Sequence, residues 1–155
     1  MKTVKLGQTT KILLKEGDKL FSQGDQGNSA YMIVYGHLDV IVDNKKMGSM
    51  KDGELFGELA LLLNQKRSAT IIAGSATELV AISKDSLNEL VSSGSVATKN
   101  LISKMCEELS KRGEFQKSPC SKKELDEILS NENQIITKLA QQIFYRLEKS
   151  TNHLD

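Results

Sequence analysis

A glutamate and an arginine lie nine residues apart within the mostly apolar stretch FGELALLLNQKRSATIIA, residues 56–73. Glu58 precedes five consecutive apolar residues, and Arg67 precedes a second apolar run that starts at Ala69. A guanidinium can pair with two phosphate oxygens at once. A carboxylate beside a phosphate would repel it unless the carboxylate accepts a hydrogen bond from a hydroxyl group. The pair therefore predicts a site for a phosphate with a neighbouring hydroxyl group, such as that of a ribose.

The residues around Glu58 predict a short helix that begins at this site. Gly57 follows a run typical of a strand and turn, and the next residues, ELALLL, are strong helix formers with room for one or two turns. The free N–H groups of a first helical turn carry partial positive charge and favour an anion. A glycine there lets a ligand approach the backbone closely. The alternative is an ordinary surface ion pair between Glu58 and Arg67, which would contribute only ~0–1 kcal/mol.

Composition limits the classes of protein to which this chain can belong. Its 155 residues suffice for one well-packed domain with a helical appendage. With 21 basic and 20 acidic residues there is no global field to attract nucleic acid or an anionic membrane, so an anion site must be local. The two cysteines lack a C-x-x-C spacing, and neither a secretory signal nor a membrane-spanning run is present. We therefore expect free thiols and a cytoplasmic protein without membrane attachment.

Short β-rich runs separated by glycines fill the chain up to residue 83. Predicted strands cover residues 12–14, 19–21, 30–35, 38–42, 46–50, 68–73 and 78–82. Leu38, Val40 and Val42 alternate with the other residues of their run, as in a strand with one buried face. Because no helix-length segment separates the strands, tight glycine turns are expected to join them into a jelly-roll-like β-barrel.

Helical periodicity replaces this pattern after residue 83. One apolar stripe is formed by Ala97, Leu101, Met105 and Leu109, and a second by Ile136, Leu139, Ala140, Ile143 and Leu147. The predicted fold class is therefore α+β, a jelly-roll-like barrel with a short phosphate-binding helix followed by C-terminal helices. We place the barrel domain at residues 1–93, with the phosphate site at 56–73, and the helices at 94–155.

The helical part contains an internal repeat. Residues 82–93, ISKDSLNELVSS, are similar to residues 120–131, CSKKELDEILSN, displaced by 38 positions. This indicates a short helix followed by a long helix, made twice, at residues 83–112 and 121–150, with a linker at 113–119. Ser121 and Glu124 have the spacing of a capping box at the start of the second copy.

The segment from Gly57 to Thr70, with GELA and RSAT six residues apart, resembles the phosphate-binding cassette of the cyclic nucleotide-binding domain family. This family includes catabolite activator protein and the regulatory subunits of cyclic AMP-dependent kinase. Residues 15–40, KEGDKLFSQGDQGNSAYMIVYGHLDV, also resemble the family's barrel hairpins, and the resemblance extends from Ile12 to about Arg112.

The resemblance implies that Glu58 accepts a hydrogen bond from the ribose 2′-hydroxyl of a cyclic nucleotide and that Arg67 pairs with its cyclic phosphate. It also implies backbone or packing contacts from Gly57, Leu59 and Ala60 at the short helix, and contacts from Ser68 and Ala69 on the phosphate side. The ligand-binding residues that it implies are Gly57, Glu58, Leu59, Ala60, Arg67, Ser68 and Ala69. Ser68 has two alternatives to a phosphate contact: its hydroxyl could meet a guanine edge, or the residue could simply end a strand.

The identity of the base remains open at this point. Cyclic AMP is favoured, cyclic GMP is second and a cyclic dinucleotide third. The aromatic candidates for capping the base are Phe115, Phe144 and Tyr145. We expect Phe21, Tyr31, Tyr35 and Phe56 to pack in the barrel, Cys106 to lie in the helical core, and His37 and His153 to lie on the surface.

Three functional classes can be compared. An enzyme requires convergent nucleophile, base or metal ligands, and two histidines with scattered cysteines provide none, so we expect no catalytic site, metal or cofactor. A DNA-binding regulator requires a further domain of roughly 60–80 residues, so no DNA binding is expected from this chain. We therefore predict a stand-alone cyclic nucleotide sensor that signals to an unknown effector protein through its C-terminal helices, as a monomer or homodimer. The alternative is a degenerate, ligand-free barrel that serves as an interaction scaffold.

Overall fold

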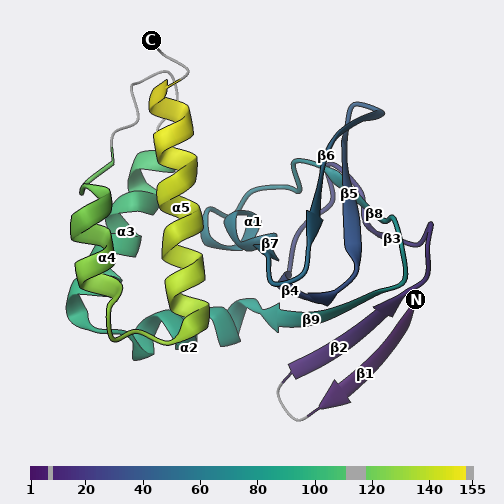
Figure 1. Ribbon diagram of the computed structural model, residues 1–155, viewed down its shortest axis with the longest axis horizontal. Helices are drawn as coiled ribbons and strands as arrows, with labels where there is room; N and C mark the ends of the chain where they lie inside the picture. Colours follow the sequence, from purple (N-terminus) through teal and green to yellow (C-terminus); the bar gives the residue numbers. More distant parts are fainter. Residues whose placement is uncertain (7–8, 111–117, 153–155) are drawn as a thin grey trace. The chain divides into compact units, whose positions relative to one another are not determined.

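The computed structural model describes residues 1–6, 9–110 and 118–152 (Figure 1). The chain divides into two compact units, Met1–Leu87 and Asn88–Asp155, called here the strand unit and the helical unit. The boundary expected at residue 93 stays a prediction. Phe115 and His153 lie outside the described residues, as does most of the predicted linker at 113–119.

The strand unit contains two antiparallel sheets (Figure 1). The first has the order β1-β2-β9-β4-β7 and the second the order β3-β8-β5-β6. The strands are β1 (Lys2–Leu6), β2 (Thr9–Leu14), β3 (Lys19–Phe21), β4 (Ser29–Tyr35), β5 (His37–Val42), β6 (Lys45–Lys51), β7 (Leu55–Phe56), β8 (Thr70–Ala73) and β9 (Thr77–Ser83). This jelly-roll-like arrangement, followed by helices, confirms the predicted α+β fold class.

Two strands were not predicted, and one begins later than predicted. β1 is rich in lysine and threonine and lacks a strong apolar pattern; it lies at the end of its sheet and pairs with β2, from Lys2↔Leu13 to Leu6↔Thr9. β7 has two residues, too few to show a period of two. Ser68 and Ala69 precede β8 rather than opening it. Strands such as these are defined by their pairing partners more than by their own residues.

The turn between β5 and β6 differs from the glycine turn that was expected. Asp43 and Asn44 connect the two strands with φ angles of 51° and 66°. Positive φ at both central residues of a two-residue hairpin is the property of a type I′ turn, and Asp and Asn tolerate it better than other side chains. β6 is an edge of its sheet, and Lys45, Lys46 and Lys51 are exposed along it.

Apolar side chains from both sheets form the core of the strand unit. The predicted alternation in β5 is confirmed, because Leu38 is buried and Val40 and Val42 pack against the core. The buried members of this core are Ile12, Leu14, Tyr31, Ile33, Leu38, Phe56, Ala69, Ile71, Ala73 and Leu79. Burial of this apolar surface provides the main drive for folding.

The helices are α1 (Glu58–Leu62), α2 (Lys84–Ser93), α3 (Val96–Ser110), α4 (Lys122–Leu129) and α5 (Gln134–Asn152). The order short, long, short, long after β9 agrees with the two predicted helix pairs, although the duplication itself stays a prediction. The capping box is confirmed: Ser121 Oγ accepts from the Glu124 N–H at 3.2 Å, and the Ser121 N–H donates to Glu124 Oε1 at 3.3 Å.

In the helical unit, α4 and α5 both contact α3. The second predicted stripe is confirmed, since Ile136, Leu139, Ala140, Ile143 and Leu147 are all buried. The first stripe is correct for Leu101 and Met105, which are buried, but wrong for Ala97, which is exposed. Its neighbour Thr98 is fully buried instead, because its hydroxyl is hydrogen-bonded inside the unit.

A carboxylate from the turn between α4 and α5 binds the start of α3. Glu132 Oε1 accepts from the Ser95 N–H at 2.9 Å and from the Thr98 hydroxyl at 3.1 Å. The Ser95 hydroxyl in turn donates to Thr98 Oγ1 at 2.9 Å. The hydrogen bond from the Ser95 backbone is the largest cause that lowers the pKa of Glu132 from its ordinary value. A negative charge is also favourable at the N-terminus of a helix.

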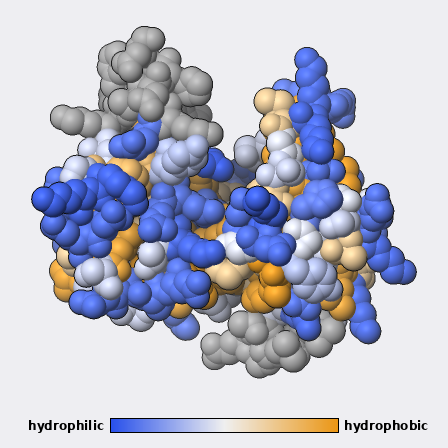
Figure 2. Space-filling model, in the orientation of Figure 1, coloured by the Kyte–Doolittle hydropathy of each residue, from blue (hydrophilic) through white to orange (hydrophobic). Residues whose placement is uncertain are grey.

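No helix in the parts of the chain given above is both long and apolar enough to cross a membrane. On the face drawn in Figure 2, hydrophilic residues predominate and hydrophobic residues lie in smaller areas between them.

The Glu132 contact predicts a pH-dependent stability. A group whose pKa is lowered by folding stabilises the protein fully above its unfolded pKa, and that contribution is lost as the pH falls through the folded value. The difference in urea midpoint between wild type and Glu132→Gln, followed by circular dichroism, should therefore be largest above about pH 5 and shrink below it. Glu127→Gln on the exposed part of α4 is the control. A difference that stays constant from neutral to acid pH would contradict this role.

Candidate functional site

The backbone around Arg67 is held by the loop between β3 and β4. The Gly24 N–H donates to the Arg67 carbonyl at 2.8 Å, and the Arg67 N–H donates to the Asp25 carbonyl at 2.8 Å. An antiparallel bridge between Gln26 and Lys66 continues this pairing. Arg67 is thus fixed by a segment about 40 residues earlier in the chain, which sequence spacing did not reveal.

The short helix α1 places Glu58 beside this segment. Gly57 caps the helix with φ of 78°, a left-handed conformation that glycine adopts without strain. Glu58 occupies the first turn, and the residue is only 3% exposed. α1 contacts β4. It has five residues, which agrees with the one or two turns predicted from the sequence.

The side chain of Arg67 is buried and points inward. It is 5% exposed, and its guanidinium donates from Nη1 to the Gly57 carbonyl at 2.9 Å and from Nη2 to the Ser29 carbonyl at 2.5 Å. Its Cζ lies 4.2 Å from the centre of the Phe21 ring, a cation–π contact. These partners come from β3, the start of β4 and the cap of α1.

Glu58 and Arg67 are two buried charges of opposite sign in one small region. Burial lowers the pKa of Arg67 from its ordinary value, while Tyr31, Glu58 and Asp25 act in the opposite direction. Burial likewise raises the pKa of Tyr31, and the nearby Arg67 charge partly offsets that rise. Removing charges from water is expensive unless they are compensated, and such perturbed groups are more frequent at binding sites than elsewhere.

The remaining predicted site residues lie along the same segment. Gly57, Leu59 and Ala60 are half-buried at α1, Ser68 is exposed, and Ala69 is part of the core. Their roles toward a ligand stay predictions. Among the predicted base-capping residues in the described chain, Phe144 is buried in the helical unit and Tyr145 is exposed.

Two aromatic residues that were expected to pack the core, Phe21 and Tyr31, also lie against the Arg67 guanidinium, and Phe56 packs on both rings. Tyr31 and Phe56 are stacked with ring centres 5.3 Å apart, and Phe21 lies 6.0 Å from Tyr31. The contact of Phe21 with Arg67 had no signal in the sequence, because packing and stacking roles use the same residue types. The packing prediction is wrong for Tyr35, which is 46% exposed beyond an irregularity in the β4–β9 register.

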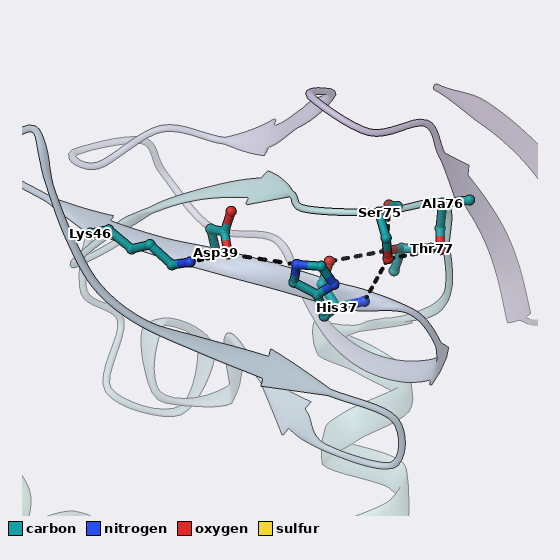
Figure 3. Close-up of polar contacts among 6 residues, drawn as sticks. All are labelled: His37, Asp39, Lys46, Ser75, Ala76 and Thr77. Carbon is teal, nitrogen blue, oxygen red and sulfur yellow. Dashed lines mark hydrogen bonds and ion pairs between the residues drawn. The ribbon is translucent and has the colours of Figure 1, made fainter.

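His37 belongs to a separate polar cluster on the second sheet (Figure 3). Its N–H donates to the Ser75 hydroxyl at 3.2 Å, and its ring lies 3.9 Å from the Asp39 carboxylate, which Lys46 approaches to 3.2 Å. The Thr77 hydroxyl donates to the Ser75 carbonyl at 2.9 Å. This cluster connects β5 to the turn before β9. The His37 ring is partly exposed, as predicted.

Other parts of the described chain provide no cluster of metal ligands. Within residues 1–6, 9–110 and 118–152, no three His, Cys, Asp or Glu side chains gather as metal ligands would. Cys106 is partly buried, and burial raises its pKa to about 11, which keeps the thiol protonated and unreactive. A surface cavity of about 620 Å³ lies along α4, in the helical unit, and includes none of the predicted site residues.

The geometry predicts that Arg67 also stabilises the fold. Arg67→Ala should lower the free energy of unfolding by about 1–3 kcal/mol, because the buried carbonyls of Gly57 and Ser29 lose their donor. Urea denaturation measures this, with Lys66→Ala as a matched control at the exposed neighbouring position. Equal midpoints for wild type and Arg67→Ala would show that the two hydrogen bonds carry no stability.

Comparison with known proteins identifies the region that contains the site. The family model described as "Cyclic nucleotide-binding domain" matches residues 11–93, which include α1, Glu58 and Arg67.

The curated relatives are much longer proteins. A cAMP-dependent protein kinase regulatory subunit from Eremothecium gossypii is 31% identical over 94 residues, which make up 61% of this chain and 20% of that protein. A cGMP-dependent protein kinase from Toxoplasma gondii is 43% identical over 61 residues, 39% of this chain and 6% of that protein. The chain thus spans a fifth or less of the length of either relative.

Solved structures show the same fold. The cAMP-bound form of the EAL enzyme Bd1971 is 29% identical with a TM-score of 0.55, over 64% of this chain and 28% of that chain. The cAMP-bound PfPKA-R is 26% identical with a TM-score of 0.53, over 68% of this chain and 39% of that chain. The family match, which covers more than half of the sequence, and the buried Glu58 and Arg67 within it lead to one conclusion: this chain belongs to the cyclic nucleotide-binding domain family.

Proposed function

We propose that this chain is a cyclic nucleotide sensor that binds a 3′,5′-cyclic mononucleotide at Glu58 and Arg67. The observation that carries the proposal is the burial of these two opposite charges at α1 and the segment that follows it, inside the matched region. Gly57, Leu59, Ala60, Ser68 and Ala69 complete the proposed site. Cyclic AMP is our first choice and cyclic GMP the second, and Bd1971 has structures with each of the two.

Arg67 would bind the phosphate with N–H groups other than the two that donate to backbone carbonyls. A guanidinium has five N–H groups. In Arg67, two of them donate hydrogen bonds to the carbonyls of Gly57 and Ser29. Hydrogen bonds in which the donor or the acceptor is ionised are roughly twice as strong as those between neutral groups. Further N–H groups of the same guanidinium would therefore bind a cyclic phosphate strongly, while the contacts with the two carbonyls hold the group in place.

Glu58 would select for the sugar. Glu58 lies in the first turn of α1, where its carboxylate would accept a hydrogen bond from a ligand hydroxyl, and a buried acceptor discriminates strongly against analogues that lack the donor. Before a ligand binds, the opposite charges of Glu58 and Arg67 attract each other, which favours the charged form of both side chains. One residue thus handles the phosphate and the other the ribose.

Binding is tested by thermal unfolding and calorimetry on the purified chain. Cyclic AMP should raise the unfolding temperature, since a ligand at 100 times its dissociation constant adds about 2.7 kcal/mol to the stability of the folded state. Linear 5′-AMP should do much less, because it lacks the cyclic phosphate geometry. Cyclic GMP measured in parallel ranks the two bases.

Two variants connect this result to the site. Arg67→Lys keeps the charge but loses the planar group, and should weaken binding strongly. Glu58→Gln should have a milder effect, because an amide oxygen still accepts a hydrogen bond. If neither cyclic AMP nor cyclic GMP shifts the unfolding temperature at millimolar concentration, the sensor proposal fails and the ligand-free scaffold replaces it.

The second part of the proposal concerns output. We infer that the C-terminal helices pass the binding event to an effector protein, with the chain acting alone as a non-catalytic, cytoplasmic monomer or homodimer that does not bind DNA. The support is the packing of α4 and α5 on α3, together with the bonds from Glu132 to Ser95 and Thr98. These contacts make the second helix pair follow any movement of α3. A ligand with different affinities for two placements of α3 would then shift their populations.

Hydrogen exchange with and without cyclic AMP tests the output. Protection of α4 and α5 should change on binding in the wild type. In Glu132→Ala the change in α4 and α5 should be smaller, because the contact with the start of α3 is lost, while Glu127→Gln should behave as wild type. Ligand binding that leaves α4 and α5 unchanged in the wild type would refute this part and leave nucleotide binding intact.

A further inference from the structure

Gly27 leaves the space in which the Arg67 guanidinium lies. A Cβ atom built on Gly27 would be 2.8 Å from Arg67 Cζ, 2.9 Å from Nε and 3.1 Å from Nη2. All three nearest atoms belong to one side chain, and to the planar end of that side chain. Non-bonded carbon atoms sit at about 3.5–4.0 Å, so the two groups cannot both keep their positions.

The backbone at Gly27 does not itself require glycine. Gly24 in the same loop has a positive φ of 91° and open space around it, so its glycine serves the backbone conformation. Gly27 is absent from the positive-φ glycines of the described chain, so an L-residue can adopt its conformation. The three nearest atoms that a side chain at position 27 would meet all belong to Arg67.

A displaced guanidinium would lose both of its hydrogen bonds to backbone carbonyls. Nη1 and Nη2 are joined in one rigid plane, and they reach carbonyls on two different segments, Gly57 and Ser29. Hydrogen bonds weaken steeply with distance and misalignment, so a shift of about an ångström breaks this double contact. The Phe21 ring below Cζ would lose its contact by the same movement.

We propose that Gly27 is a positioning residue that sets where Arg67 presents its donors to the phosphate of the ligand. The inference rests on the proposed function for its binding consequence, but not for its structural part. Position 27 acts only through Arg67: it fixes the guanidinium over Phe21 and against the two carbonyls. Because an arginine end group is flexible, alanine at position 27 moves the guanidinium and leaves the surrounding backbone in place.

The test is a double-mutant cycle of wild type, Gly27→Ala, Arg67→Lys and the double variant. Gly27→Ala should weaken cyclic AMP binding, measured by calorimetry, by about tenfold, as expected for the loss of one charge-assisted hydrogen bond. In the Arg67→Lys background the same change should alter affinity by less than about twofold, since lysine has no planar group to displace. Gly48→Ala is the matched control, because a Cβ there meets nothing within 4 Å and φ is not positive.

The urea midpoints of the same four proteins give a readout that needs no ligand. Gly27→Ala should lower the midpoint in the arginine background and leave it unchanged in the lysine background. An equal loss of stability in both backgrounds would overturn the proposal, because position 27 would then act on the backbone. If wild type fails to bind cyclic AMP or cyclic GMP, the proposed function falls, and the coupling in the urea midpoints still decides the role of Gly27.

Discussion

The strand unit is organised around one buried cation. The Arg67 guanidinium joins β3, the start of β4 and the cap of α1 through a ring contact and two backbone carbonyls. A buried charge is costly unless its hydrogen-bonding groups have partners. The three segments must therefore stay in position together, because each one compensates part of the cost of burying the guanidinium. The left-handed Gly57 and the open position at Gly27 follow from this requirement, since side chains there would meet the guanidinium. Binding function and fold stability therefore share the same few contacts.

The helical unit contains a smaller counterpart of opposite charge. Glu132 uses its carboxylate on the Ser95 N–H and the Thr98 hydroxyl, and so connects the turn before α5 to the first turn of α3. Burial of apolar side chains along α5 stabilises the unit, but the hydrophobic effect does not depend on orientation. The hydrogen bonds of Glu132 do depend on it, and they favour one register between the helices. In each unit a single charged side chain determines how separate segments meet.

Much of this arrangement was predictable from the sequence, for reasons that differ between elements. The strand at Leu38, Val40 and Val42, the stripe of α5 and the capping box at Ser121 are local patterns, and the structure confirms them. The family likeness around Glu58 and Arg67 was also visible as a motif, and the family match supports it. β1, β7 and the Asp43–Asn44 turn were missed because pairing partners and backbone angles decide them. The contacts of Arg67 with Phe21, Gly27 and Ser29 join residues about 40 positions apart, and no local periodicity encodes such contacts.

The lysines on β6 have a consequence for self-association. An edge strand offers unpaired N–H and C=O groups to any other strand, and an extended edge of this kind can seed fibrillar stacking. Lys45 and Lys51 bring positive charge to that edge, whereas the charge of Lys46 is paired with Asp39. Two copies of the chain meeting edge to edge would bring these ammonium groups together and would have to desolvate them. Electrostatic repulsion thus acts as a built-in safeguard against polymerisation through this sheet, and high salt, which screens it, is the condition under which that safeguard weakens.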